Sequence, residues 1–283
     1  MVTEAVTYPT TPTEAAAVKK AGALPYAGGT DLMIHQAENI RNGQCPPMVF
    51  LGGVKAFHGI TKGNNELRIG PLTTMAELAA SAQIPPILSL ACNAMGSPAL
   101  RNIATLGGNI CTASPAGDSL PALYTLDAEV KLVSPASVRR MPVHRFITGP
   151  GKTALEPDEL LAAITIPVPA QELFHYRKVS PRVANAITKV SLAVSLAVDD
   201  EIVRDIGIAF GAVGPTVIRC SPIEDVCIGL PLHRLYRDRA RLAAMARDSV
   251  KPIDDLRSTA LYREAVAANL FAEFLETLNH PKP

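Results

Sequence analysis

Residues 105–118 read TLGGNICTASPAGD, and this stretch decides how the rest of the chain is interpreted. Most of its positions hold small or polar residues, and it contains neither lysine nor histidine. Because such residues bury little apolar surface, the stretch is a poor core element. Its composition therefore favours a wall that faces a polar ligand.

A second glycine pair occurs earlier in the chain, in AGGTD at residues 27–31, directly after a short apolar run. Adjacent glycines lack Cβ atoms, so the backbone can adopt positive φ and approach a ligand closely. Consecutive amides that turn the same way bind anions, and Thr105, Asn109 and Thr112 add neutral donors. Each loop alone is better explained as an ordinary glycine turn. Together they predict a diphosphate site formed by main-chain donors of both loops.

A third glycine-rich segment, TGPGKTA at residues 148–154, is interpreted as a structural loop. A phosphate-binding P-loop needs a glycine where this chain has Phe146. The glycine spacing does match the dinucleotide fingerprint GxGxxA. However, Glu156 and Pro157 follow at once, so no extended helix is available to hold a pyrophosphate.

Composition excludes several classes of function. The formal net charge of the 283 residues is +1, which gives no electrostatic reason to expect nucleic acid or an anionic membrane as a partner. The longest uncharged apolar stretch near the middle, IGIAFGAVGPTVI, is shorter than the roughly 20 residues of a membrane-spanning helix. The N-terminus has no signal-peptide pattern. We expect a soluble, cytoplasmic protein without a membrane span.

Cysteine and histidine spacing predicts no metal site. The five cysteines show no CxxC motif or Cys/His cluster, and we expect them to be buried, reduced thiols. Four histidines also lack the spacing of a catalytic triad or of a metal site, and we expect each to be solvated or packed. They are His35, His58, His144 and His175.

The pattern along the chain predicts a mixed α+β protein. A capped helix is expected within TPTEAAAVKKAG at residues 11–22, with Thr13 as the cap and Gly22 just after its end. The proline-rich IPVPAQE at 166–172 is the best candidate boundary. Beyond it, the apolar runs 187–198 and 203–214 are predicted to be antiparallel strands, and residues 231–278 are predicted to be helical.

Several of these segments resemble the FAD-binding (medium) subunit of molybdenum hydroxylases, a family that includes xanthine, carbon monoxide and nicotinate dehydrogenases. AGGTDLM at 27–33 is similar to the first flavin loop, and TLGGNICTASPAGDSLPAL at 105–123 is similar to the second. FITGPGKTALEPDELLAAITIP at 146–167 resembles the end of the flavin domain. Segments 176–198 and 208–220 resemble the start of the C-terminal domain. The match spans almost the whole chain in the right order.

The resemblance implies a fold and a domain division. The fold is α+β: a vanillyl-alcohol-oxidase-type FAD-binding domain of two subdomains, followed by a C-terminal α+β domain. The FAD-binding domain is expected over residues 1–167, with subdomains of about 1–56 and 57–167. The C-terminal domain is expected over 168–283.

The resemblance also implies which residues bind FAD. The first glycine loop would line the pyrophosphate and adenosine side, and the second would oppose it. Asp118 would contact a polar portion of the flavin, Leu161 would offer a backbone contact and Lys178 would lie near the ring, although an ordinary surface ion pair is an equal alternative for Lys178. Met95 departs from relatives that place an aromatic ring against the adenine. The predicted FAD-binding residues are Pro25, Tyr26, Ala27, Gly28, Gly29, Thr30, Asp31, Thr105, Gly107, Gly108, Asn109, Thr112, Asp118, Leu161 and Lys178.

The function that the resemblance implies is electron transfer within a complex. Substrate would be hydroxylated at molybdopterin on a large partner subunit, and electrons would pass through [2Fe–2S] centres of a small partner to this FAD. NAD⁺ or another acceptor would receive them, in a dimer of heterotrimers, and no side chain of this subunit would be catalytic. Purines and other N-heterocycles are the expected substrates. A stand-alone flavin oxidoreductase of the same fold and a scaffold subunit without FAD are the alternatives.

A group of basic residues lies near the start of the C-terminal helical region. We interpret Arg234, Arg237 and Arg241, with Tyr236, as a solvated helix face rather than as a nucleotide or partner surface.

Overall fold

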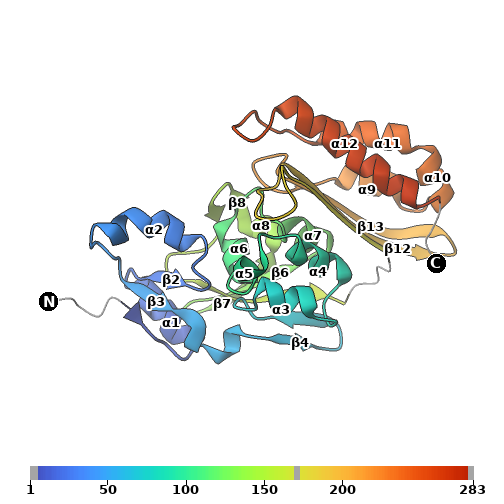
Figure 1. Cartoon of the computed structure of the whole chain (residues 1–283). Helices are drawn as coiled ribbons and strands as arrows, with labels where there is room; N and C mark the ends of the chain where they lie inside the picture. The colour runs from blue at the N-terminus through green and yellow to red at the C-terminus, as the bar shows by residue number, and fades with distance from the viewer. Residues whose placement is uncertain (1–5, 169–172, 280–283) are drawn as a thin grey trace. The chain divides into compact units, whose positions relative to one another are not determined.

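The computed structural model describes residues 6–168 and 173–279, and the chain forms two compact units. Unit 1 comprises Met1–Ile84, Ser97–Ala113 and Ala128–Val168, and unit 2 comprises Pro85–Gly96, Ser114–Asp127 and Pro169–Pro283. Figure 1 shows the elements of both in chain order. The predicted mixture of helices and strands is confirmed, but residues 169–172 of the proline-rich boundary lie outside the described residues.

Unit 1 contains a small parallel sheet in the order β1-β3-β2. Helix α1 connects β1 to β2, and it buries Ala15 and Ala16. The elements of this part are β1 (Val6–Thr7), α1 (Pro12–Lys20), β2 (Leu24–Tyr26), α2 (Leu32–Arg41), β3 (Met48–Phe50), and the short 3-10 helices η1 (Leu51–Gly53) and η2 (Lys55–Phe57).

The first helix starts earlier than predicted, and the assignment of its cap to Thr13 is wrong. Thr11 is the N-cap: its hydroxyl accepts a hydrogen bond from the Glu14 amide, and the Glu14 carboxylate accepts one from the Thr11 amide. This reciprocal capping box satisfies two amides that a helix start would otherwise leave unpaired. Pro12 suits the first helical position because an N–H there would have no helical partner.

The larger sheet of unit 1 is antiparallel, in the order β4-β5-β10-β6-β7. Its central strand β10 is buried from Leu160 to Ile166, in agreement with its unbroken apolar sequence. The strands are β4 (Ile60–Lys62), β5 (Glu66–Ile69), β6 (Glu129–Val133), β7 (Val138–Pro142) and β10 (Leu160–Pro167). The short helices of unit 1 are α3 (Met75–Ala80), α5 (Pro98–Arg101), α6 (Leu106–Thr112) and α8 (Val143–Phe146).

The segment TGPGKTA forms the hairpin of β8 (Ile147–Gly149) and β9 (Lys152–Thr153), so no helix follows its glycines. This agrees with its interpretation as a structural loop. The Gly151 amide donates to the carbonyl of Ala113, the residue that ends α6. The hairpin therefore braces the end of the helix that carries the second glycine pair.

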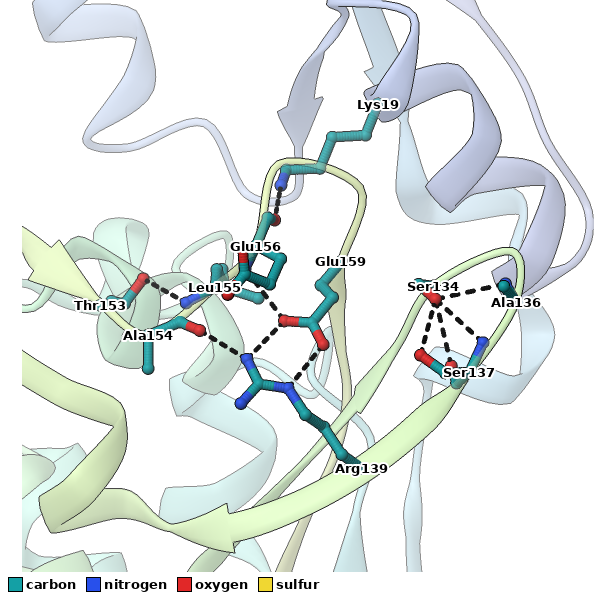
Figure 2. A network of polar contacts seen from close by, with 10 residues as sticks. All are labelled: Lys19, Ser134, Ala136, Ser137, Arg139, Thr153, Ala154, Leu155, Glu156 and Glu159. Atoms are coloured by element: carbon teal, nitrogen blue, oxygen red, sulfur yellow. Dashed lines mark hydrogen bonds and ion pairs between the residues drawn. The ribbon is translucent and has the colours of Figure 1, made fainter.

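An ion pair between a partly exposed arginine and a buried glutamate holds the turn that follows this hairpin (Figure 2). Arg139 of β7 donates from Nε and Nη2 to the Glu159 carboxylate at 2.6 and 2.7 Å, and Nη2 also reaches the Ala154 carbonyl at 2.6 Å. The same carboxylate accepts the Glu156 amide at 2.9 Å, while Lys19 of α1 donates to the Glu156 carbonyl. Hydrogen bonding from Arg139 holds the pKa of Glu159 below its usual value.

Replacing Arg139 with methionine is expected to lower the free energy of unfolding by about 2 kcal/mol near neutral pH, because Glu159 stays buried without its charged partner. Glu159 has a lowered pKa in the folded state, so its contribution is present above the unfolded pKa and disappears as the pH falls through the folded one. The difference between the two proteins should therefore narrow below about pH 4.

Urea unfolding at neutral and at acidic pH measures this difference. Arg140→Met is the matched control on the same strand, because its pair with Glu66 is about half exposed on both sides. That control should change stability by less than about 1 kcal/mol. Equal losses in the two variants would show that the Arg139 network contributes nothing specific.

Unit 2 is formed around a four-stranded antiparallel sheet in the order β11-β12-β13-β14. The predicted antiparallel pairing of the two long apolar runs is confirmed in β12 and β13. Its strands are β11 (Leu173–Val179), β12 (Val190–Asp199), β13 (Ile202–Gly211) and β14 (Ile218–Arg219). Its helices are α4 (Pro86–Asn93), α7 (Leu120–Thr125), α9 (Ser221–Cys227), α10 (Leu232–Arg237), α11 (Arg239–Ser249) and α12 (Ala260–Thr277).

The two faces of this sheet carry residues of different size. Large apolar residues of β12 and β13, such as Leu192 and Ile208, share one core with α11 and α12. The other face packs on α7, which Figure 1 labels together with β12 and β13. This face carries small residues such as Ser191, Ala193 and Ala209. There Ser195 donates to the Thr125 carbonyl at 3.0 Å, and a Cβ at Gly207 would lie 2.8 Å from the same oxygen. Small side chains on this face therefore allow α7 to approach the strands closely.

The predictions for the cysteines and for His175 can be compared with the structure. Cys92, Cys220 and Cys227 are buried as expected, but Cys45 is exposed and Cys111 is partly exposed, so the expectation is wrong for those two. His175 packs on the Phe274 ring at 5.4 Å, which fits a packed histidine. Within residues 6–168 and 173–279, no helix is long and apolar enough to cross a membrane.

Candidate functional site

The first glycine segment links β2 to α2 in unit 1, and neither of its glycines tolerates a side chain. A Cβ at Gly28 would lie 1.9 Å from the carbonyl oxygen of Ile103, and a Cβ at Gly29 would lie 2.6 Å from the Tyr26 hydroxyl. Gly29 also has φ of +72°, a conformation that favours glycine. Both substitutions would displace neighbouring atoms, so the close packing of this loop explains its glycine pair.

The main-chain N–H groups of residues 28–31 donate no hydrogen bond to any residue within the described ranges. The carbonyls of Gly29 and Asp31 accept from Met33 and His35 in the first turn of α2. Because the Thr30 N–H points opposite to the Gly29 carbonyl across a trans peptide, it points away from that helix. The residues themselves are only partly buried or exposed. Unpaired amides around a glycine in the left-handed region form a concavity that attracts an anion.

The second glycine segment uses its main-chain amides differently from the prediction. Thr105 caps α6, and its hydroxyl accepts from the Gly108 amide at 3.1 Å. The amides of Leu106 and Gly107 donate to the carbonyls of Thr73 and Pro71. Because these donors already have protein partners, this segment does not offer them to a ligand. Its contribution is limited to side chains and to the space beside its glycines.

The two adjacent glycines of this segment have different surroundings. A Cβ at Gly107 would lie 2.5 Å from Pro71 Cβ and 2.7 Å from its carbonyl oxygen, so Gly107 is required for packing. A Cβ at Gly108 would meet only the Thr105 hydroxyl, at 2.9 Å, within 4 Å. Gly108 is therefore enclosed less tightly than Gly107, and the neighbour that bounds it is a side chain rather than main chain.

The two glycine segments lie side by side within unit 1. Gly28 packs on the main chain of Ile103, which is two residues before the α6 cap Thr105. Two segments far apart in the sequence are thus brought together at this contact. Asn109 and Thr112 follow within α6 and are partly exposed.

In unit 2, Asp118 and Lys178 form a buried ion pair. The Lys178 Nζ lies 2.9 Å from Asp118 Oδ2 and also donates to the Ala94 carbonyl at 3.0 Å. The two side chains are only 8% and 10% exposed, so the alternative of an ordinary surface lysine is wrong. Burial raises the pKa of Asp118, an effect that the charge of Lys178 and the hydrogen bond from Thr188 oppose.

Two partners of Asp118 were missed by the sequence analysis. Thr188 donates its hydroxyl to Asp118 Oδ1 at 2.6 Å, and the Tyr176 hydroxyl donates to the Asp118 carbonyl at 3.0 Å. Neither residue belongs to a motif with recognisable spacing. Only the folded chain brings them to Asp118.

The remaining predicted residues lie in unit 1. Pro25 and Tyr26 belong to β2, and Ala27 follows them at the start of the loop. Leu161 lies in β10, at a register shift between Leu161 and Ala163 in its pairing with β6. Leu161 itself pairs with Leu132, and the residue without a register partner at this bulge is Ala162. Among the described residues, no group of three or more His, Cys, Asp or Glu side chains could hold a metal ion.

Comparison with known proteins identifies the family. Residues 2–169 match the family model described as the FAD binding domain in molybdopterin dehydrogenase, and residues 175–278 match the CO dehydrogenase flavoprotein C-terminal domain. The chain is 34% identical to the xanthine dehydrogenase FAD-binding subunit of Escherichia coli O157:H7, over 73% of this chain and 72% of the relative. It is 30% identical to the nicotinate dehydrogenase FAD-subunit of Eubacterium barkeri, over 89% and 88%.

Solved structures agree with these sequence matches. A carbon monoxide dehydrogenase from Hydrogenophaga pseudoflava that lacks the Mo-pyranopterin moiety superimposes with a TM-score of 0.87 at 25% identity, covering 95% of this chain and 94% of that one. Quinoline 2-oxidoreductase from Pseudomonas putida 86 shares the fold, with a TM-score of 0.88 at 23% identity. The chain therefore belongs to the FAD-binding (medium) subunit family of the molybdenum hydroxylases, as an oxidoreductase subunit with an FAD-binding domain and a C-terminal flavoprotein domain.

Proposed function

We propose that the loop of residues 28–31 binds the diphosphate of FAD and that the α6 segment forms the opposite wall. The run of amides at residues 28–31 that have no partner among the described residues, on a loop that contacts Ile103 and Ala104 just before α6, supports this proposal. A diphosphate needs several donors, and neutral amides held in place by Gly28 and Gly29 supply them without a lysine. The fit to FAD thus rests on the main-chain donors of unit 1.

The α6 segment contributes side chains rather than amides to this site. The Thr105 hydroxyl, the Asn109 amide group and the Thr112 hydroxyl are neutral groups suited to the phosphate oxygens and the polar chain of FAD. Asp118 and Lys178 are proposed to act on the flavin portion, and Leu161 to offer its main chain. These three assignments derive from the family resemblance.

Bound FAD supplies the ability to take up single electrons and release a pair. The residues of this chain bind and orient the cofactor, and none is needed as a general base. We propose that electrons come from [2Fe–2S] centres on a small partner subunit, which receives them from a large molybdopterin subunit. NAD⁺ is the proposed acceptor, and a dimer of heterotrimers in the cytoplasm is the proposed assembly. The names of the xanthine and nicotinate dehydrogenase relatives support a purine or another N-heterocycle as the substrate of the complex.

Purification of the chain with its neighbours tests this function. The expected result is a flavin absorbance spectrum, together with molybdenum and iron that co-purify on a larger and a smaller chain. A flavin spectrum without either metal or other chains would favour a stand-alone flavin oxidoreductase. A complex that carries molybdenum and iron but no flavin would instead indicate a scaffold subunit.

A further inference from the structure

Asp118 is held by side chains from two later segments of unit 2, and Thr188 is the partner without an assigned role. Thr188 lies just before β12 and is 2% exposed. Its hydroxyl binds one carboxylate oxygen of Asp118 at 2.6 Å, and Lys178 binds the other at 2.9 Å. Tyr176, on the same face of β11 as Lys178, holds the main-chain carbonyl of Asp118. Both the carboxylate and the main-chain carbonyl of Asp118 are therefore held by hydrogen bonds.

A buried carboxylate stays ionised only if its charge is compensated by hydrogen bonds or by an opposite charge. Thr188 and Lys178 each satisfy one oxygen of Asp118. Removal of the Thr188 hydroxyl would favour the protonated acid, since a hydrogen bond to the ionised carboxylate stabilises the charged form. Valine has nearly the shape of threonine but cannot donate this bond.

The protonation state of Asp118 decides the charge of the whole cluster. The titratable groups that face it are Lys178 and Tyr176 on β11 and Cys92 on α4. Burial raises the pKa of Cys92 to about 12 and that of Tyr176 well above its usual value, so both stay neutral. Ionised Asp118 therefore leaves the cluster neutral, whereas protonated Asp118 leaves the positive charge of Lys178 uncompensated.

We propose that Thr188 is a positioning residue whose hydroxyl keeps Asp118 ionised and paired with Lys178, and so keeps the flavin site neutral at this cluster. The inference rests on the proposed function, which assigns Asp118 and Lys178 to the flavin. Thr188 acts through Asp118 and needs no contact with the cofactor itself. Its effect appears in the charge of the site, and hence in the reduction potential of the flavin.

The experiment measures the flavin reduction potential as a function of pH in the full chain, purified with its FAD and any partners. In Thr188→Val, the pH at which Asp118 is protonated should rise, because the ionised carboxylate has lost a hydrogen bond that favours it. Between the pKa of Asp118 in the wild type and its higher pKa in the variant, Asp118 is ionised in the wild type but protonated in the variant. In this pH range the variant has one more positive charge at the cluster, so its flavin should have a more positive reduction potential than the wild-type flavin. Thr188→Ser should restore the wild-type profile, because serine keeps the hydroxyl.

Two further variants separate this role from a structural one. Thr125→Val removes another buried hydroxyl of unit 2, which bonds only to the Ala122 carbonyl of its own helix. Asp118→Asn removes the negative charge and should give the more positive potential at every pH. If Thr188→Val matches Thr125→Val while Asp118→Asn shifts the potential, the positioning role is wrong. If Asp118→Asn and Lys178→Met also leave the potential unchanged, the assignment of these residues to the flavin fails as well.

Discussion

Replacing Gly108 with valine is expected to give a folded protein that retains less than about a tenth of the wild-type flavin at limiting FAD. The added Cβ would lie 2.9 Å from the Thr105 hydroxyl, a side-chain atom that can rotate aside, whereas the neighbours at Gly107 include main chain. The space next to Gly108 is the space we assign to the diphosphate. Two methyl groups there would exclude the phosphate oxygens from their donors, and a loss of only 1.4 kcal/mol weakens binding tenfold.

Flavin absorbance per protein and the thermal midpoint together measure this effect. Gly107→Val is the paired comparison, because its side chain would collide with the main chain of Pro71. The Gly107 variant should lose stability first and flavin as a consequence, whereas the Gly108 variant should lose its flavin with no more loss of stability than a disturbed Thr105 cap causes, about 1 kcal/mol. Normal flavin occupancy in a folded Gly108 variant would place the cofactor elsewhere.

Gly28→Ala is expected to weaken FAD binding by at least about a hundredfold, which corresponds to about 2.7 kcal/mol. Even one methyl group would lie 1.9 Å from the Ile103 carbonyl oxygen, which cannot move aside without the main chain. The loop of residues 28–31 would therefore shift away from the segment that leads into α6. The loop and the opposite wall would no longer fit the same diphosphate.

Titration of the FAD-free protein with FAD gives the dissociation constant for this comparison. Gly149→Ala is the control in unit 1, since its nearest neighbour would be Lys152 at 3.9 Å and its φ is ordinary. That variant should bind FAD as the wild type does. Equal affinity of the Gly28 and Gly149 variants would contradict the role of the Gly28 contact in shaping the site.

The sequence predicted the features that depend on the backbone alone. Glycine pairs mark places where Cβ atoms are excluded, and the structure gives a close contact for Gly28, Gly29 and Gly107. Long apolar runs predicted β12 and β13 because a strand buried on both faces needs such a sequence. These signals are local, so they can be read without knowledge of the fold.

The features that the sequence did not predict depend on pairings between distant residues. The amides of Leu106 and Gly107 are occupied because the chain at Thr73 and Pro71 passes beside α6. Thr188 reaches Asp118 across 70 positions, and no spacing rule links them. Main-chain donors and buried hydroxyls can be assigned to a ligand only when their protein partners are known.

The interleaving of the chain between its units has a consequence for synthesis. Helices α4 and α7 belong to unit 2 although they precede β10 of unit 1, and α7 packs on β12 and β13. The residues of α7 are all buried in the complete protein. When only residues up to 168 have left the ribosome, strands β12 and β13 are missing, so the apolar residues of α7 that they cover are still exposed. Until β12 and β13 have been translated, the apolar surface of α7 stays exposed unless a chaperone covers it.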